Sequence, residues 1–525
     1  MKKLTFILMA IFLIFAITAC NFDDNEKKEK EDTNRKFWAR NMKTDEFYQV
    51  SAEKLAENSR CIIWAEKGSN VTEATANNMA NAYNHIYTIM MNAFGYEVSS
   101  NDLYDLFGVK GLPDMDTMQI AHYLATEKTS DAKLTILLLD IKDEYKPGVN
   151  DSFVAGFFDA VHLNKKQNNP KYPKLKYSNE LDMIYVDTYP SKLGSDESNA
   201  TLAHEMQHLM NLVTSAVNRY DEHTGEVPQM DLWINEGLSC AAEWLYKNGD
   251  PLKRVDWFNS NRGEIGLGNN FYVWGNRDKN PYANLDDYAT AYLFFQYLRL
   301  QADEPDDIYF DIITSNYPDY RAVINAESIN SNHKYKWERL LRDWFAANYM
   351  KNSSGLYGYK GAITVNPPMF PNDKGTVSLF PGEGVYSRIN GSDSVPSFSD
   401  NSIIKYAGLN SSGDPITSGS AKGVRLTYNV NKIAAGSAVT GNTTGVASSV
   451  NISVPDGNAS LQIAPNVFSG PYIVDAGYFL RKNQNYGMSD NVIRSVSVIN
   501  DGEQAENPIS LKLDRSKLKR VFINE

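Results

Sequence analysis

Cysteine and histidine are scarce in this chain of 525 residues, which contains 3 cysteines and 7 histidines. So few cysteines cannot build the disulfide framework of a small secreted domain, although Cys61 and Cys240 could still pair. Basic residues are in the minority, because 52 Lys and Arg face 64 Asp and Glu and leave a net charge of -12. Nucleic acid is therefore not an expected partner, since phosphate binding requires a basic surface.

Long apolar runs are missing after the first twenty residues, so the body of the chain is expected to be soluble. At the N-terminus, Lys2 and Lys3 precede an apolar stretch from Leu4 to Ile17, which is typical of an export signal. The stretch ends in ITAC, which resembles a bacterial lipobox. That resemblance implies that Cys20 receives palmitate-type acyl chains and anchors the protein to a membrane of the bacterial cell envelope, facing outside the cytoplasm. The alternative is a simple secretory signal with an incidental cysteine.

Length and composition predict two or three domains, because 42% hydrophobic and 12% aromatic residues are enough for sizeable cores. After the signal of residues 1–20, residues 21–42 are almost wholly polar or charged and predict a tether. Residues 43–350 predict an α+β domain, and residues 351–395, rich in Gly and Pro, are interpreted as a connecting region. Residues 396–525 alternate in short runs between turn residues, which predicts an all-β, sandwich-like domain.

Within residues 43–350, apolar runs of strand length come first and helix-like patterns follow. Strands are predicted at 61–66, 134–141, 153–163 and 181–190. Helices are predicted at 72–94, 232–246, 285–300 and 337–350, and another begins in the stretch TLAHEMQHLMNLV from residue 201.

This last stretch contains an HExxH motif made by His204, Glu205 and His208. Residues four apart lie on one face of a helix, so the two imidazoles point the same way and can bind one metal ion. Glu205 is one residue along, close enough to act as general base on a water that the metal activates. A catalytic zinc site needs a third protein ligand, which the helix itself does not supply.

The third ligand must come from elsewhere in the chain. A metzincin would need a glycine at position 211 and a histidine at 214, but the sequence has Asn211 and Thr214. The nearby Asp221, Glu222 and His223 could coordinate, although they stand in a polar stretch that predicts a loop. The segment DLWINEGLSCAAEW, which starts at Asp231 and predicts a helix, is the better candidate.

The segment WINEGLSCAAE resembles the second zinc helix of gluzincin metallopeptidases, in which the Glu of an NEG triplet is the third ligand. The resemblance implies that Glu236 binds the metal, separated from His208 by 27 residues, and that Asn235 supports a ligand. Glu243, two turns further on the same face, could orient a ligand histidine. The order of strands and zinc helices resembles the hyicolysin family most closely, from about residue 61 to residue 350. The resemblance implies a mixed sheet followed by zinc-binding helices and one bound Zn²⁺.

Gluzincins often use a Tyr or a His to stabilise the oxyanion. Tyr288 matches the position of the tyrosine in the aminopeptidase branch of the clan, and Tyr292, one turn on, is its rival. His333 is a weaker candidate. That branch also carries a Gly-x-Met-Glu-Asn segment for the substrate amino group, whereas this chain has VAGFFDAV, without that Glu. An endopeptidase acting on a protein or peptide substrate is therefore favoured.

The sequence thus predicts a lipid-anchored, extracytoplasmic zinc metalloendopeptidase. Two alternatives stay open: an aminopeptidase of the same clan, and a catalytically inactive binding or adhesion lipoprotein. An inactive descendant is expected to lose Glu205 or a ligand first, yet His204, Glu205, His208 and Glu236 are all present. The natural substrate cannot be read from the sequence, because specificity is determined by loops that line the pockets.

Overall fold

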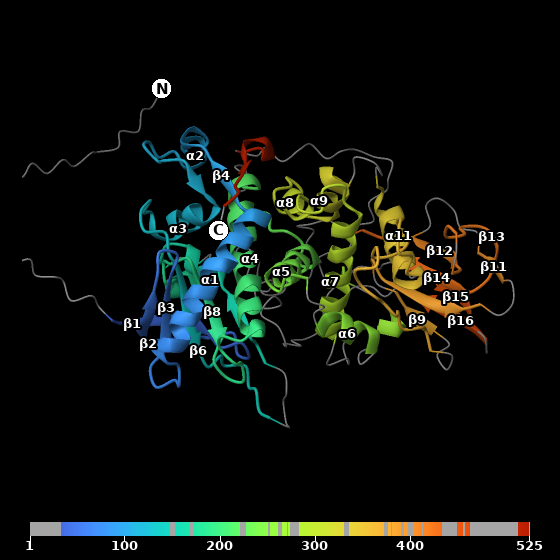
Figure 1. The fold of residues 1–525 in the computed structure, drawn as a ribbon, viewed down its shortest axis with the longest axis horizontal. Helices are drawn as coiled ribbons and strands as arrows, with labels where there is room; N and C mark the ends of the chain where they lie inside the picture. Colours follow the sequence, from blue (N-terminus) through green and yellow to red (C-terminus); the bar gives the residue numbers. More distant parts are fainter. Residues whose placement is uncertain are drawn as a thin grey trace, which may run out of the picture.

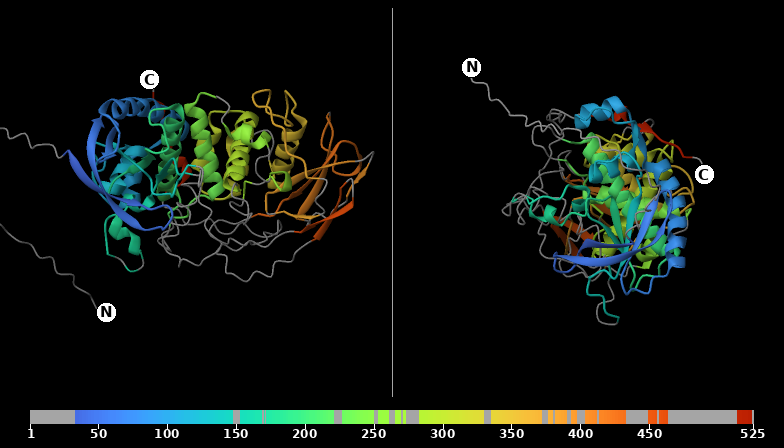
Figure 2. Two further views of the ribbon diagram at one scale, coloured as in Figure 1. Left: turned by 90° about the horizontal axis from the view of Figure 1, so that it is seen from below. Right: turned by 90° about the vertical axis from the view of Figure 1, so that its left-hand side faces the viewer.

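The computed structural model describes most of the chain between residues 33 and 523. The residues outside the description are 1–32, 148–152, 169, 171, 221–226, 250–252, 261–264, 270, 273–282, 330–334, 372–375, 380, 390–392, 397–402, 412, 433–448, 455–456, 463–512 and 524–525. The described residues combine helices with one mixed sheet and several smaller sheets, so the fold is α+β as expected. Sheet, helices and smaller sheets follow one another along the long axis of the molecule (Figures 1 and 2).

The N-terminal layer is a six-stranded sheet with the strand order β1-β2-β3-β6-β8-β7. Its strands, in that order, are β1 (Asn34–Arg40), β2 (Phe47–Glu57), β3 (Cys61–Glu66), β6 (Leu134–Leu139), β8 (Met183–Asp187) and β7 (Gly156–Phe158). Strands β3, β6 and β8 are parallel, whereas β1, β2 and β7 pair antiparallel. Every residue of β6 and β8 is buried, as expected for central parallel strands covered on both faces. Strand β7 is left at an edge of the sheet.

Helices α1 (Glu73–Phe94) and α4 (Asp196–Asn218) lie side by side against this sheet (Figure 1). Helix α4 packs on β7 and β8, and α5 (Leu232–Tyr246) packs on α4. Helix α7 (Ala283–Gln301) packs on α5 in turn, so the central helices form successive layers. The other described helices are α2 (Ser100–Phe107), α3 (Thr117–Thr126), α6 (Lys253–Ser260), α8 (Ile308–Ile313), α9 (Tyr320–Ile324), α11 (Trp337–Met350) and the 3₁₀ helices Ala160–Leu163, Pro173–Tyr177, Ile265–Leu267 and Arg515–Lys517.

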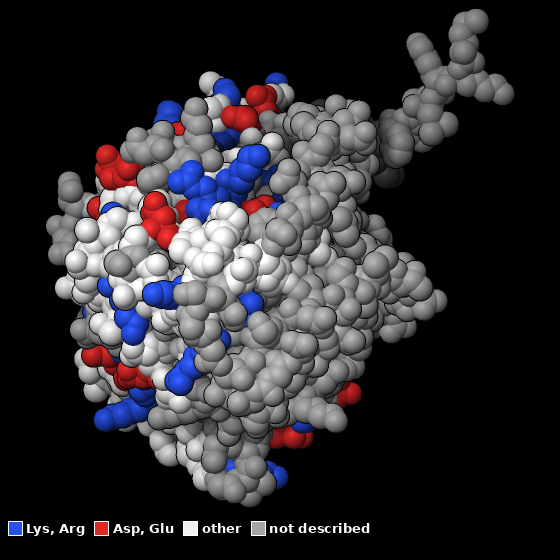
Figure 3. All heavy atoms as spheres, turned by 90° about the vertical axis from the view of Figure 1, so that its right-hand side faces the viewer, with Lys and Arg blue, Asp and Glu red and all other residues white. Residues whose placement is uncertain are grey.

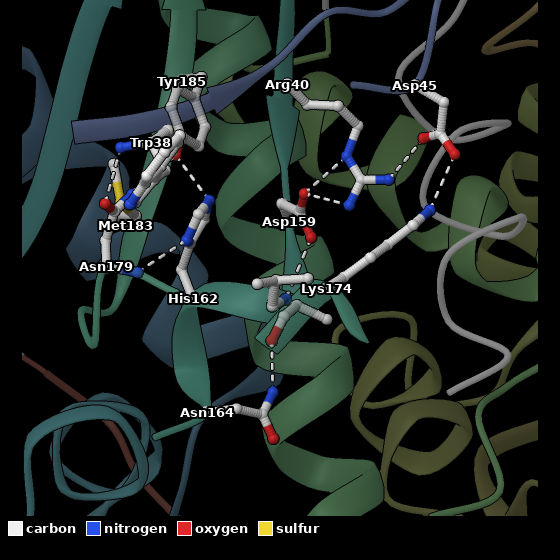
Figure 4. A network of polar contacts seen from close by, with 12 residues as sticks. Trp38, Arg40, Asp45, Asp159, His162, Asn164, Lys174, Asn179, Met183 and Tyr185 are labelled. Carbon is white, nitrogen blue, oxygen red and sulfur yellow. Dashed lines mark hydrogen bonds and ion pairs between the residues drawn. The ribbon is translucent and has the colours of Figure 1, made fainter. Parts of the chain in front are cut away.

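The large sheet curls until its first strand meets residues near its opposite edge (Figure 4). The backbone N–H of Trp38 on β1 donates to Asn179 Oδ1 at 2.8 Å, and Asn179 Nδ2 donates to the Trp38 carbonyl at 2.9 Å. The hydroxyl of Tyr185, on β8, donates to the same carbonyl at 2.6 Å. Because β2, β3 and β6 separate β1 from β8 within the sheet, these bonds hold the curled sheet closed.

Arg40, at the end of β1, ties the same strand to the segment that follows β7 (Figure 4). Its buried guanidinium donates to Asp159 at 2.8 Å and to Asp45 at 2.7 Å. The other oxygen of Asp159 accepts the backbone N–H of Val161 at 3.0 Å, which starts a 3₁₀ turn. The predicted strand over 153–163 is therefore a three-residue strand and a turn, because the Asp159 side chain competes for the backbone.

The predicted tether differs from the structure at its end. Strand β1 begins at Asn34, and Phe37 and Ala39 are fully buried within the sheet layer. A short apolar stretch at the end of a highly charged segment was enough to form an edge strand. No helix in the described ranges is apolar and long enough to cross a membrane, and the N-terminal signal lies outside them.

The region after α11 forms small sheets with the orders β10-β14-β12, β11-β13 and β15-β16-β9. Their strands are β9 (Thr376–Ser378), β10 (Gly384–Arg388), β11 (Asp393–Val395), β12 (Ile404–Leu409), β13 (Gly419–Ala421), β14 (Val424–Asn429), β15 (Ser449–Val454) and β16 (Gly457–Gln462). Basic and acidic side chains lie among one another on the described part of this end of the molecule (Figure 3).

Residues 351–395 therefore differ from the predicted connecting region. They contribute β9, β10 and β11, and each of these strands pairs with a strand from beyond residue 396. Val385 and Tyr386 on β10 are both buried. Most of the Gly and Pro residues that predicted a linker lie between α11 and β9, and the short strands that follow were hidden by the composition of the whole stretch.

The end of the chain also differs from the predicted domain boundary. Strand β17 (Lys519–Arg520) pairs with β4 (Tyr96–Val98), which also pairs with β5 (Met115–Asp116). Leu513 and Leu518 are buried, and Arg515 forms an ion pair with Asp311 beside them. The last described residues thus pack on the α+β part. This contact joins residues far apart in the chain, so no local sequence pattern predicts it.

His162 is buried in the closed curl of the sheet as a neutral side chain. Its Nδ1 accepts the backbone N–H of Asn179 at 3.1 Å, so Nε2 carries the proton and donates to the Tyr185 hydroxyl at 2.7 Å. Burial lowers the pKa of His162 to about 4, against the opposing effect of Asp159.

We expect the protein to lose stability as the pH falls from 7 to 4, partly through His162. In the unfolded chain this side chain binds a proton near its ordinary pKa of 6.5, whereas the folded side chain does so only near 4. The unfolded state binds more protons in this window, so the free energy of unfolding falls by roughly 3 kcal/mol. His162→Gln, which keeps a donor and an acceptor, should flatten the curve measured by urea denaturation at each pH.

High salt should leave the difference between the two proteins unchanged, because burial and not surface charge causes it. Parallel stability curves for wild type and His162→Gln would show that this histidine does not contribute to the pH dependence.

Candidate metal centre

Helix α4 brings the two histidines of the HExxH motif together. It begins after Ser195, whose hydroxyl accepts the backbone N–H of Ser198, and Glu197 in the first turn suits the positive end of the helix dipole. His204 and His208 follow one turn apart, with their ring centroids 4.8 Å from each other. Both are buried, so the helix presents two imidazoles to the interior of the protein.

Helix α5 places Glu236 in front of both rings. Its Oε2 atom lies 3.3 Å from His204 Nε2 and 3.6 Å from His208 Nε2. All three side chains are buried, and Glu236 has no exposed surface. The residues predicted to be metal ligands are therefore brought together by the packing of α5 on α4.

The outer nitrogens of the two rings are held by other side chains. His204 Nδ1 donates to Glu243 Oε1 at 2.7 Å, and His208 Nδ1 lies 3.1 Å from Asn235 Oδ1. An Nδ1 that donates to an oxygen carries the proton of a neutral ring, so Nε2 of that ring keeps its lone pair for a metal ion. Asn235 and Glu243 thus lie against the outer nitrogens of the two rings.

Two residues near the ligands were missed by the sequence analysis. Ser239 places its hydroxyl 3.2 Å from His208 Nδ1, and Arg254 on α6 donates to Glu243 at 2.7 Å. Ser239 stands one turn beyond Asn235 on the same helix face, so helical spacing could have found it. Arg254 comes from a separate helix, and nothing in its local sequence identifies it.

Helix α7 contributes Tyr288, whose hydroxyl donates to Glu236 Oε2 at 2.9 Å. Close packing makes this possible, because a Cβ atom on Gly237 would lie 2.1 Å from Cε2 of Phe295. Only a glycine lets α7 approach α5 this closely beside Glu236. Tyr292 is also buried on α7, but within the described part of the chain no hydrogen bond joins it to Glu236.

Glu205 faces the edge strand β7. A Cβ atom on Gly156 would lie 3.3 Å from Glu205 Cγ and 2.8 Å from Thr201 Cγ2, so the strand passes directly over the helix. The Glu205 carboxylate is 2% exposed, and the neighbouring backbone of Phe158 on β7 acts to lower its pKa. Burial, with Glu236 as a further cause, raises the pKa of Glu205 to about 8 in the absence of a metal ion.

The other groups of the site respond to burial and to each other. Burial tends to lower the pKa of His204, but its bonds to Glu236 and Glu243 outweigh this and raise it. Burial lowers the pKa of His208 to about 4. Burial opposes the ionised form of Glu243, but Arg254 and His204 together bring its pKa down to about 2. The pKa of Glu236 is also lowered, because the two imidazoles outweigh its burial.

Three buried atoms of this cluster have no hydrogen-bond partner among the described residues: His208 Nε2, Glu236 Oε1 and Glu205 Oε2. Buried polar atoms are normally paired, so such a group of unpaired acceptors calls for a ligand. Two imidazole nitrogens and one carboxylate are the donor set of catalytic zinc sites, which keep a further position open. The residues present fit a bound zinc ion.

Other predicted site residues lie elsewhere. Asp221, Glu222, His223, His333 and Cys20 fall outside the described residues. Cys61 and Cys240 are both described and buried, and they do not form a disulfide with each other.

Comparison with known proteins points to the same chemistry. No protein-family model matches the chain. Over 243 residues the chain is 30% identical to the Neutral metalloprotease ShpI of Staphylococcus hyicus. This alignment covers 45% of the chain and 50% of that protein, so the chain spans about half the length of the curated relative that it matches. The similarity connects the chain with metalloproteases at the level of a distant relative.

We expect Glu243→Gln to weaken zinc binding by about 10- to 100-fold, because a neutral amide holds the His204 ring less firmly and makes it a poorer ligand. Glu197→Gln on the same helix α4 is a matched control, since Glu197 is 61% exposed and lies outside the ligand cluster. Competition with a zinc-binding dye measures both affinities. Equal affinity of Glu243→Gln and wild type would show that Glu243 does not support a ligand.

Proposed function

We propose that the protein is a zinc-dependent metallopeptidase of the gluzincin type. One observation carries the proposal: the two Nε2 atoms of the HExxH histidines converge on Glu236 in a buried cluster whose outer nitrogens are already bonded. The similarity to a neutral metalloprotease supports it independently. This arrangement resembles the hyicolysin family in the residues that the sequence analysis singled out.

In this proposal His204, His208 and Glu236 hold the zinc ion. When bound, zinc supplies a Lewis acid that acidifies water and polarises a carbonyl group. Glu243 and Asn235 keep the ring nitrogens oriented, so the ligands do not have to reorganise when the ion binds.

Glu205 is the general base. It is buried beside the ligands without being needed to hold the ion, and its Oε2 atom has no partner among the described residues. From this position it accepts the proton of the attacking water and delivers it to the leaving amine of the peptide bond. Its side chain lies against Gly156 of β7, on the side where a substrate would pass.

Tyr288 stabilises the oxyanion in this mechanism. Its hydroxyl already points at Glu236 Oε2 from 2.9 Å, within reach of the centre of the cluster. A phenol at this position donates to the oxygen on which negative charge develops in the transition state. Arg254 packs over the Tyr288 ring at 4.4 Å and restricts its orientation.

We infer that cleavage is internal to the substrate chain. Strand β7 is an edge strand of the sheet, so an extended peptide can pair with it. Such a peptide can continue beyond Glu205 on both sides of the bond that is cut. The stretch VAGFFDAV around β7 has no Glu to capture a free amino terminus. Both features favour an endopeptidase over an aminopeptidase.

We also propose that the mature protein is a lipoprotein, anchored through Cys20 to a membrane of the bacterial cell envelope and exposed outside the cytoplasm. The support is the export signal with its terminal ITAC and the charged stretch that follows it. Strand β1 starts soon after this stretch, so the catalytic part would be held near the membrane surface.

We expect Glu205→Gln to abolish internal cleavage of an unfolded protein, with a loss of 10²- to 10⁴-fold in rate, because the amide cannot accept a proton. Zinc content, measured by elemental analysis, should remain at about one ion per chain. Products are mapped by mass spectrometry, with chelator-treated wild type as the control. Stepwise loss of N-terminal residues would instead identify an aminopeptidase. Equal inactivity of zinc-loaded wild type and Glu205→Gln would identify a binding lipoprotein without turnover.

Tyr288→Phe should lower kcat by about 10²- to 10³-fold and change KM little, because the phenol acts on charge that develops only in the transition state. Tyr292→Phe is the matched control on the same helix and should retain most activity. Metal content is measured for both variants, since Tyr288 also bonds Glu236. A larger loss in Tyr292→Phe than in Tyr288→Phe would reverse the assignment.

A further inference from the structure

A cavity of about 300 Å³ lies beside the candidate metal centre, at the junction of α4, α5, α6 and the start of α7. This volume is at the lower end of ligand pockets and suits one amino-acid side chain. One wall is apolar, made by Ala200, Trp257 and Leu285. The Trp257 ring is held in place, because its Nε1 donates to Asp286 at 2.8 Å. The cavity therefore has a fixed wall against which the stem of a side chain can pack.

The cavity borders the reaction centre from two directions. Glu243, in its wall, bonds Nδ1 of His204, so one imidazole ring separates the cavity from the ligand atoms at Nε2. Thr201, also in its wall, stands one turn before Glu205 on α4 and lies beneath Gly156 of β7. Side chains of an extended peptide alternate in direction, so a peptide paired with β7 directs one side chain toward α4 near the cut.

The charges around the cavity are unequal. Three cations line it, Lys247, Lys253 and Arg254, against the two carboxylates of Glu197 and Glu243. The Glu243 carboxylate is already bonded to Arg254 and His204. Glu197 is 61% exposed and only 3.6 Å from Lys247, which makes a weak ion pair.

Lys253 is the cation left over. It is exposed at the start of α6, and no ion pair joins it to a carboxylate in the part of the chain that the structure describes. A further negative charge in the cavity would therefore meet Lys253 and the weakly paired Lys247.

We propose that this cavity binds an acidic side chain of the substrate, Glu or Asp, next to the peptide bond that is cut. The proposal deepens the peptidase function and rests on it. The carboxylate lies between Lys247 and Lys253, and the apolar wall at Trp257 covers the methylene groups. Lys253 is the specificity-determining residue, because it forms no ion pair among the described residues and acts on the exposed Glu197 through its charge alone.

The test uses two sets of otherwise identical peptides with one cleavable bond. One set carries Glu, Gln, Leu or Lys directly before that bond, and the other carries them directly after it. We expect one of the sets to show a kcat/KM for Glu about two- to fivefold above Gln, with Lys lowest, as for a partly exposed ion pair. Lys253→Glu should lower the Glu to Lys ratio in that set by about tenfold or more, because the charge at the cavity is reversed.

Lys110→Glu is the matched control and should leave the Glu to Lys ratio as in wild type. Lys110 is exposed and follows the end of α2, a helix that lies well away from α6 in Figure 1. Cleavage of both sets without a Glu preference, or a ratio that Lys253→Glu does not change, would overturn the inference while leaving the peptidase intact. Absence of cleavage of any peptide by zinc-loaded wild type would instead count against the peptidase function itself.

Discussion

The contact between one carboxylate and two imidazoles organises the centre of this protein. Glu236 on α5 lies within 3.6 Å of both HExxH histidines on α4, and it can do so only if the two helices are locked in register. Asn235 and Glu243, on the same helix as Glu236, bond back to the outer nitrogens of those histidines. One face of α5 therefore supplies Glu236 and the two side chains that hold the imidazole rings in place. The packing of the central layers and the geometry of the candidate metal centre therefore depend on the same two helices, α4 and α5.

The layers on either side adapt to this pair. Gly237 removes the side chain that would keep α7 away, and the hydroxyl of Tyr288 reaches Glu236 as a result. On the other side, Gly156 lets β7 pass close over Glu205, and the Arg40–Asp159 pair holds the segment that follows this strand. Breaking such a buried ion pair is costly, so it stabilises the segment that directly follows the edge strand near the site.

The sequence predicted those features of the fold and the site that are determined by residues close together in the chain. The helix around His204, the helix that carries Glu236 and the position of Tyr288 were predictable, because helical spacing and a resemblance both act over short stretches. The start of β1, the strands within 351–395 and the return of residues 513–523 to the α+β part were missed, since each depends on a partner far along the chain. Arg254 and the lining of the cavity were missed for the same reason.

The charge of the buried cluster explains why these residues belong together. Glu205, Glu236 and Glu243 are three carboxylates within or beside one buried group, and the permanent cation Arg254 is bonded to Glu243. Burying ionised carboxylates without balancing charge is strongly unfavourable, so protons or a cation must offset the remaining two. A divalent ion bound between His204, His208 and Glu236 would supply two positive charges and would leave Glu205 ionised, which is the state that the proposed general base requires. The buried negative charge that makes the cluster unfavourable without a ligand thus also favours the binding of a metal ion.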